Sequence, residues 1–275
     1  MENKVAREED GTIILSIAIP QGLIKKTVNE IIEETAKSAS IPGFRKGKAP
    51  RKLIEQKVDK EKIKEEVLKK LLPQAYADAV KNNDIKPIIN PRIHVEKLED
   101  GGIWTFTATT CEAPQVDLGK YKEELKTLNA KGKIIIPGKD QKQTSIEEII
   151  RTLLENIEIK VSRIIVEQET ERLLAQTLDE IKRLGITLDQ YLVSTRKTVD
   201  DLKRDYGKKA LDDIRLEFAL AKIAEVEKIT VSESEIDDAI KNAKDENERK
   251  SLKDNKYLLA GVLRQQKTLD FLRNL

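Results

Sequence analysis

The stretch "IPGFRKGKAP", residues 41–50, interrupts a sequence that is otherwise rich in helix-forming residues. Its two prolines and two glycines exclude a regular helix or a central strand, so this segment is predicted to be a loop. Phe44 is the large apolar residue of the loop, and no acidic residue lies between positions 41 and 52. The cations that surround Phe44 and continue beyond the loop are Arg45, Lys46, Lys48, Arg51 and Lys52.

The loop separates two predicted helices. Before it, large apolar and smaller residues alternate in "TIILSIAI" (12–19), which predicts a half-buried strand, and residues 23–39 follow an amphipathic helical pattern. After it, apolar residues recur at helical spacing over residues 53–72. Pro73 is expected to end that helix, with a shorter helix around residues 75–80.

A β-hairpin is predicted next, from "RIHVEKL" and "IWTFTATT", which are joined by an Asp-Gly-Gly turn. Its second strand alternates threonines with Trp104, Phe106 and Ala108. Residues 1–112 are therefore predicted to form an α+β domain, with strands at its ends and helices between them.

The second half of the chain has a different composition, because all eight prolines lie at or before Pro137. Residues 113–144 lose hydrophobic periodicity and are predicted to be an extended linker. Residues 145–275 are predicted to be helical throughout, since residues suited to helix capping precede each apolar stripe. The stripes are narrow, so an elongated all-α domain with arms or clefts is expected. The capping residues are Ser145 with Glu148, Ser162, Thr187, Thr198, and Ser232 with Glu235.

Composition excludes several classes of function. Lys and Arg number 51 against 49 Asp and Glu, so any basic patch must be local. One cysteine and one histidine exclude an intramolecular disulfide, cysteine- or histidine-rich metal sites and the usual catalytic triads, and no cofactor is expected. The first residues do not resemble a secretion signal, and no stretch approaches the ~18 apolar residues of a membrane span. A cytoplasmic protein without membrane attachment is expected.

The basic loop carries the strongest functional signal. A solvated connector is its simplest interpretation, but Phe44 on a loop tip is costly in water unless a partner buries it. Arginine pairs bidentately with phosphate and lysine adds a point charge. The loop is therefore predicted to grip a phosphate-rich surface while Phe44 enters an apolar or stacking pocket.

Other residues carry weaker chemical signals. His94 is expected to be exposed on its strand, and Cys111 to be a small, partly buried filler. The glycine spacing of the loop does not match a phosphate-binding loop. Adjacent carboxylates on a helix do not face a common substrate and are interpreted as surface charge. These pairs are Glu33 with Glu34, Glu65 with Glu66, and Asp212 with Asp213.

The order of these segments resembles the trigger factor family, bacterial chaperones that meet nascent chains at the ribosomal exit tunnel. "IPGFRKGKAP" is similar to the ribosome-docking signature of that family, and "EAPQVDLGKY" follows the hairpin as it does there. The second half resembles the family's C-terminal substrate-binding domain in "GITLDQYL", "KTVDDLKRDY" and "KTLDFL". The resemblance covers nearly the whole chain outside residues 122–144.

The resemblance implies a mechanism. Residues 1–112 would be a ribosome-binding domain whose 42–50 loop docks on ribosomal RNA and a tunnel-exit protein of the large subunit. Residues 145–275 would be a helical cradle that holds nascent or unfolded polypeptides by several weak contacts, without ATP. Exposed apolar patches would favour a weak homodimer away from the ribosome. The residues expected to bind the ribosome or shape the loop are Gly43, Phe44, Arg45, Lys46, Gly47 and Lys48.

The middle of the chain departs from the family. Trigger factors usually carry an FKBP-like prolyl isomerase domain between these parts, whereas only residues 122–144 separate them here. A segment of that length cannot bury an independent core. The chain is therefore predicted to be a natural or engineered family member without isomerase activity, and not an enzyme.

Two alternatives stay open. A ribosome-independent holdase would use the helical half alone, and an RNA-binding or ribosome-assembly factor without client activity would use the basic loop alone. The lack of a secretion signal argues against a periplasmic holdase, and the second alternative leaves the helical half without a role. Nothing in the sequence supports an enzyme.

Overall fold

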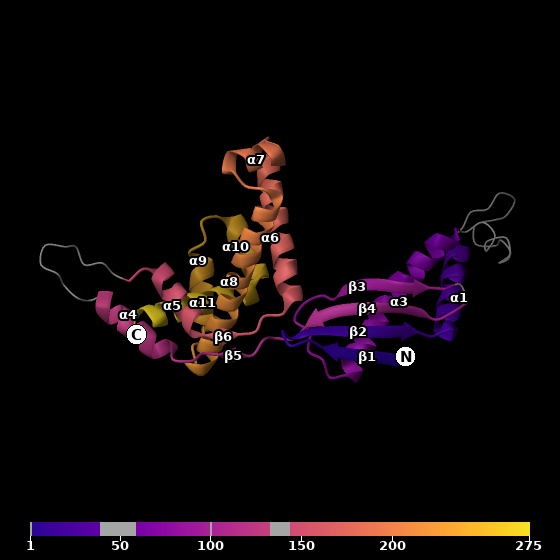
Figure 1. Ribbon diagram of the computed structural model, residues 1–275, viewed down its shortest axis with the longest axis horizontal. Helices are drawn as coiled ribbons and strands as arrows, with labels where there is room; N and C mark the ends of the chain where they lie inside the picture. The colour runs from indigo at the N-terminus through magenta and orange to yellow at the C-terminus, as the bar shows by residue number, and fades with distance from the viewer. Residues whose placement is uncertain (1, 39–58, 100, 133–143) are drawn as a thin grey trace, which may run out of the picture. The chain divides into compact units, whose positions relative to one another are not determined.

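The computed structural model describes residues 2–38, 59–99, 101–132 and 144–275 (Figure 1). The chain divides into two compact units, unit 1 (Met1–Ala113) and unit 2 (Pro114–Leu275). The predicted loop at residues 42–50 lies outside the described residues.

In its described residues, unit 1 combines a four-stranded antiparallel sheet, in the order β1-β2-β4-β3, with two helices. Helix α3 lies behind the sheet in Figure 1, and α1 packs against α3. The arrangement confirms the predicted α+β class for this half. The elements are β1 (Glu2–Arg7), β2 (Thr12–Ile19), α1 (Gln21–Ser38), α3 (Lys60–Asn82), β3 (Arg92–Leu98) and β4 (Trp104–Cys111).

Alternating apolar residues build the core of unit 1. The register places Leu15 of β2 opposite Ala108 of β4, and Ile17 opposite Phe106, and all four side chains are buried. Because alternate residues of a strand project to opposite faces, the sheet has one apolar face, and this face packs in a single cluster with the helices. The hairpin of β3 and β4 is the one predicted from sequence.

Helix α3 continues through Pro73, so the predicted break is wrong. Proline lacks the N–H that would bond to the carbonyl four residues earlier, which usually ends or kinks a helix. Here the residues buried on either side of Pro73 recur every four positions and form one stripe, which packs in the core, while Pro73 is exposed. Packing of a continuous stripe outweighs the lost hydrogen bond. The stripe consists of Val67, Leu71, Ala75 and Ala79.

Strand β1 is an element that the sequence did not predict. Its residues, "ENKVAR", show no clear alternation of apolar and polar side chains. The strand forms by pairing with β2 over its whole length, from Glu2 opposite Ala18 to Arg7 opposite Ile13. Its backbone hydrogen bonds, rather than a hydrophobic pattern, define it.

Where the structure describes unit 2, its secondary structure is helical apart from a two-residue ladder, in which Val116 of β5 (Val116–Asp117) pairs with Ile159 of β6 (Glu158–Ile159). The two longest helices of the unit, α6 and α8, pack along each other as a hairpin, with α7 at its end (Figure 1). The helices are α4 (Tyr121–Gly132), α5 (Ile146–Asn156), α6 (Arg163–Arg183), α7 (Leu188–Thr195), α8 (Val199–Val226), α9 (Glu233–Lys241), α10 (Glu246–Asp254) and α11 (Lys256–Arg273).

Local capping residues set four of the helix starts, as the sequence predicted. Each side chain accepts a hydrogen bond from the backbone N–H three residues later, and the side-chain oxygen of the residue at that position accepts a hydrogen bond from the backbone N–H of the cap. The caps are Ser145 of α5, Thr187 of α7, Thr198 of α8 and Ser232 of α9.

The predicted extended linker contains a helix, α4, that belongs to the core of unit 2. Tyr121 and Leu125, one turn apart, are buried in the cluster that α5, α8 and α11 also form. The side-chain amide of Asn129 donates to the carbonyl of Leu272 at 3.1 Å. The described part of this segment is therefore a packed element, and the prediction of an extended chain is wrong for residues Tyr121–Gly132.

Candidate functional site

All the residues of the predicted docking site lie outside the described residues: Gly43, Phe44, Arg45, Lys46, Gly47 and Lys48. The structure describes the helices on either side, α1 ending at Ser38 and α3 beginning at Lys60. These helices pack together in the core of unit 1. The chain thus enters and leaves the 39–58 segment from one packed helical pair.

Charged contacts orient this helical pair. The Lys70 ammonium lies 3.2 Å from a carboxylate oxygen of Glu30 and 3.5 Å from one of Glu34. The hydrogen bond to Glu30 and the charge of Glu34 raise the pKa of Lys70. At the start of α3, the Asp59 carboxylate accepts a hydrogen bond from the Glu61 N–H at 3.0 Å. Such exposed contacts add little stability but fix the direction of the helix start.

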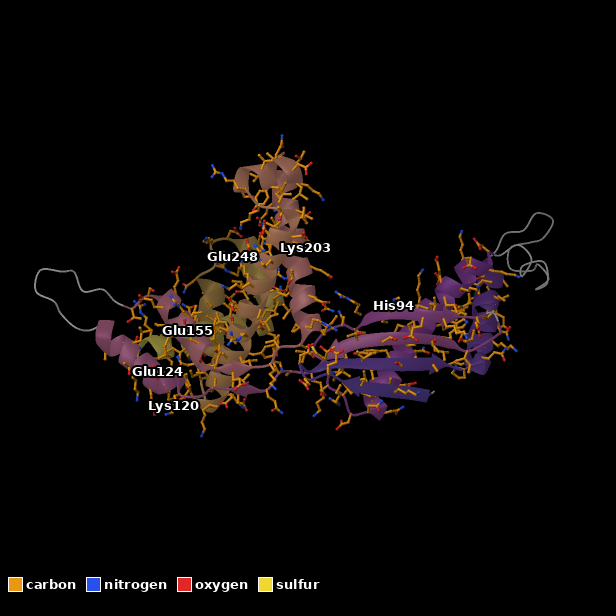
Figure 2. The ribbon with its side chains drawn as sticks, in the orientation of Figure 1. His94, Lys120, Glu124, Glu155, Lys203 and Glu248 are labelled. Carbon is orange, nitrogen blue, oxygen red and sulfur yellow. The ribbon has the colours of Figure 1, made fainter. Side chains whose placement is uncertain are left out.

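The other residues singled out in the sequence, His94 and Cys111, differ in their exposure to solvent. His94 is exposed on β3, as predicted (Figure 2). Cys111 is fully buried, more than the partial burial predicted. Within the described ranges, no group of three or more His, Cys, Asp or Glu side chains could hold a metal ion. In the same ranges, no helix combines the length and apolarity needed to cross a membrane.

Polar contacts fix the α6–α8 hairpin and the turn that precedes α8. The hydroxyls of Thr177 and Tyr206 are hydrogen-bonded at 2.7 Å, and the Lys197 ammonium lies 2.7 Å from the Asp205 carboxylate. The hairpin therefore presents α7 on a preformed support. The buried apolar residues of the two helices include Leu173, Ile181, Leu202, Ala210 and Ile214.

Large apolar side chains are exposed where the hairpin turns. Leu184 is 74% exposed and Val193 is 79% exposed. Side chains of this size lower the free energy when another apolar surface covers them, so an uncovered group of them is a candidate contact surface. We call this group the tip patch; it consists of Leu178, Leu184, Ile186, Val193 and Val199.

Helix α11 carries a second group, which we call the α11 patch: Tyr257, Leu258 and Val262, exposed by 90%, 65% and 59%. Leu258 and Val262 are one turn apart. A Cβ atom added at Gly261 would meet nothing within 4 Å, so this side of the helix faces open space. The sequence shows the apolar residues of α11 but not which of them the neighbouring helices cover, so neither patch was among the predicted sites.

Polar contacts hold α11 in place on the rest of unit 2. The Lys267 ammonium lies 2.8 Å from a Glu235 carboxylate oxygen and donates to the carbonyl of Thr230 at 2.7 Å. The hydrogen bond from Lys267, with those from the Ser232 cap, lowers the pKa of Glu235 to about 2. The α11 patch is therefore carried by a helix that is anchored near its other end.

A second polar group joins the start of α4 to the end of α8. The Tyr121 hydroxyl donates to the Glu227 carboxylate at 3.0 Å, and the Lys122 ammonium lies 2.7 Å from the same carboxylate. Burial, with the neighbouring Glu227, raises the pKa of Tyr121, and Lys122 lowers the pKa of Glu227. The tyrosine stays protonated and donates, so the contact orients α4 on the helical core.

The fold and these surfaces define a class of protein: an α+β unit whose sequence carries the basic segment "IPGFRKGKAP", followed by a helical unit that exposes apolar side chains at the end of a hairpin and on its last helix. Residues 1–134 match the family model of the bacterial trigger factor protein (TF), and residues 137–274 match that of its C-terminus. The chain belongs to the bacterial trigger factor family. Only residues 135–136 separate the two matched regions, so no isomerase domain lies between them.

Similar proteins include three curated trigger factors. That of Ligilactobacillus salivarius (strain UCC118) is 40% identical over 109 residues, 40% of this chain and 25% of the relative. That of Limosilactobacillus reuteri (strain DSM 20016) is 38% identical over 125 residues, which are 44% of this chain and 28% of the relative. That of Staphylococcus carnosus (strain TM300) is 35% identical over 116 residues, which are 42% of this chain and 26% of the relative. The matched region thus spans about a quarter of each relative's length.

A solved structure shares the fold of the whole chain. It comes from work on promiscuous substrate recognition in the folding and assembly activities of the trigger factor chaperone. The TM-score is 0.69 at 15% sequence identity, over 100% of this chain and 99% of that chain. The likeness confirms the predicted order of an α+β part and a helical part.

Proposed function

We propose that this protein is an ATP-independent chaperone that docks at the ribosomal exit tunnel through residues 42–50 and holds nascent or unfolded polypeptides on unit 2. The observation that carries the proposal is the exposure of the tip patch and the α11 patch on the helical unit of a trigger factor family member. Residues 1–112 serve as the ribosome-binding domain and residues 145–275 as the client-binding domain. The protein acts in the cytoplasm, beside ribosomal RNA and a tunnel-exit protein of the large subunit.

The two patches suit clients that have not yet folded. Such clients expose leucine, valine and aromatic side chains, and each contact with a patch is weak. A chain long enough to touch both patches is held more tightly than either patch alone could hold it. Release needs no nucleotide, because a client that buries its own apolar surface gives up these contacts. In the absence of ribosomes and clients, the same patches favour weak self-association.

Docking rests on the charge and the single aromatic ring of the loop. If its five cations, through Lys52, neutralise five phosphates, log affinity falls against log salt concentration with a slope of roughly −4. Phe44 then supplies an apolar or stacking contact that charge alone does not. The rest of the chain is nearly balanced in charge, so this attraction is local to the loop.

Replacing Phe44→Ala, Arg45→Ala and Lys46→Ala together tests the docking step. We expect the full chain to lose co-sedimentation with ribosomes, and the remaining affinity to show a salt slope shallower by roughly 1.5, since two phosphate contacts are gone. The matched control removes two exposed cations of α8, Lys208→Ala and Lys209→Ala, and should sediment like the unaltered protein. Unchanged sedimentation of the triple variant would reject docking through this loop and favour a ribosome-independent holdase.

The absence of an inserted domain between the matched regions supports a second part of the proposal, that the protein has no prolyl isomerase activity. In a protease-coupled assay with a proline-containing peptide, the isomerisation rate should equal the uncatalysed rate at every protein concentration tested. A rate that rises in proportion to protein concentration would contradict this and make the protein an enzyme.

A further inference from the structure

Unit 1 contains a groove that the proposed function does not use. It has a volume of about 530 Å³ and lies between α1, the start of α3 and the turn that joins β3 to β4. One face of α1 lines it along three turns, from Gln21 to Ile32, at helical spacing. Its apolar lining residues are Ile24, Val28, Ile32, Ile63 and Trp104.

The rim of this groove is positively charged. Three lysines and a single carboxylate line it, and that carboxylate, of Glu99, is 2.7 Å from the ammonium of Lys97. Lys64 is paired with Glu61 at 3.3 Å. Lys25 and Lys60 are exposed, and neither belongs to an ion pair within the described ranges. Two cations of the rim are thus available to a partner's carboxylates.

The turn that forms one wall of the groove is held in shape. The Trp104 indole N–H donates to the carbonyl of Glu99 at 3.1 Å, and the Gln21 amide donates to the carbonyl of Gly101. Gly101 has a φ of +78°, a conformation that side-chain-bearing residues rarely adopt. The groove is therefore preformed, and a ligand does not need to order its walls.

We propose that the groove binds a segment of unfolded polypeptide in which a bulky apolar side chain lies next to acidic residues. The apolar lining accepts the side chain, and a volume of this size falls within the range of about 300–1,000 Å³ that ligand pockets occupy. Lys25 and Lys60 attract the carboxylates and repel basic segments. The inference rests on the proposed chaperone function, and it adds to unit 1 a client subsite that selects by charge.

The groove has a built-in reporter, because Trp104 lines it and is the chain's only tryptophan. The experiment titrates the full chain, without ribosomes, with a peptide of Leu, Phe and Glu and with its counterpart in which Lys replaces Glu. The acidic peptide should shift or quench the tryptophan emission saturably. It should bind about tenfold more tightly than the basic peptide, as two exposed ion pairs allow.

Reversing the charge of the two rim lysines tests whether they cause the preference for the acidic peptide. Lys25→Glu with Lys60→Glu should abolish the preference for the acidic peptide or reverse it. Lys26→Glu with Lys62→Glu makes the same change at exposed neighbours that do not line the groove, and should leave the preference intact. Suppression of client aggregation through the tip and α11 patches should be retained in both variants, so failure of the groove is distinguishable from failure of the chaperone proposal.

Three results would overturn the inference: an emission that neither peptide changes, equal affinities for the two peptides, or a preference that survives reversal of Lys25 and Lys60. A single-stranded RNA oligonucleotide serves as the competing ligand. If it changes the Trp104 emission and displaces the acidic peptide, the groove is a nucleic-acid site and the polypeptide assignment is wrong.

Discussion

At the scale of single residues, the Glu235 carboxylate makes two kinds of contact. It completes the cap of α9 by accepting from the Ser232 N–H at 2.8 Å, and it pairs with Lys267 of α11. These contacts lower its pKa from 4.5 to about 2. A carboxylate whose pKa falls on folding stabilises the folded state above its unfolded pKa. That contribution is lost as the pH falls from about 4.5 through about 2.

Glu235→Gln is therefore expected to lower the unfolding midpoint at pH 7, and its difference from the unaltered protein should shrink between pH 4.5 and pH 2. Glutamine keeps the shape and the cap but loses the charge that attracts Lys267. The effect is small because the pair is partly exposed to solvent. Urea unfolding at a series of pH values measures it. Glu233→Gln on the same turn is the control; a Glu235 difference that stays constant with pH would contradict the linkage.

The same residues show what the sequence predicts best. A cap and its partner lie three positions apart, so the interaction is complete within one turn and visible in the sequence. The starts of α5, α7, α8 and α9 follow from it. The alternation in β2 is equally local, and the strand runs over the residues predicted.

At the scale of elements, prediction fails where packing decides. Pro73 is a local signal against a helix, yet a buried stripe on both sides of it keeps α3 continuous. Helix α4 is hard to predict for the opposite reason. Its own residues show only a weak helical pattern, and its stability comes from packing against residues far along the chain. Leu125 is fully buried only because α5, α8 and α11 surround it.

The packing of α4 leads to a stability prediction. Leu125→Ala should lower the free energy of unfolding of unit 2 by about 2–5 kcal/mol, the cost of removing a buried leucine side chain and leaving a cavity. Lys126→Ala, at the exposed next position, should change it by less than about 0.5 kcal/mol. Chemical denaturation followed by helical circular dichroism measures both. Equal, small effects would mean that α4 is a spacer rather than part of the core.

At the scale of the whole molecule, the proposed docking segment is readable because its glycines, prolines and cations are contiguous in "IPGFRKGKAP". The proposed client surface is not contiguous in the sequence. Leu184 follows α6, Val193 lies on α7 and Leu258 lies on α11, so their shared exposure depends on how several helices pack. An apolar stripe in a sequence predicts burial, and only the assembled unit shows which stripes have no intramolecular partner.

Because unit 2 carries both patches, substitutions in one patch should reduce the binding affinity of long clients more than that of short ones. If a long unfolded client occupies both at once, Leu184→Ser with Val193→Ser should weaken its binding roughly tenfold or more, because the second contact no longer benefits from a high effective concentration. Leu258→Ser with Val262→Ser should do the same. A short apolar peptide, which reaches one patch at a time, should lose only a few-fold in either variant.

Fluorescence anisotropy of a labelled unfolded protein and of a labelled short peptide measures the two affinities. Exposed α8 substitutions, Lys203→Ser with Lys208→Ser, are the matched control and should alter neither. If the long client loses no more affinity than the short peptide, the patches act independently and simultaneous occupation is wrong. If the unaltered protein binds neither, the helical unit holds no clients and the RNA-binding alternative is favoured. Loss of long-client affinity in both patch variants, with docking on ribosomes retained, would place holding and docking on different units of one chain.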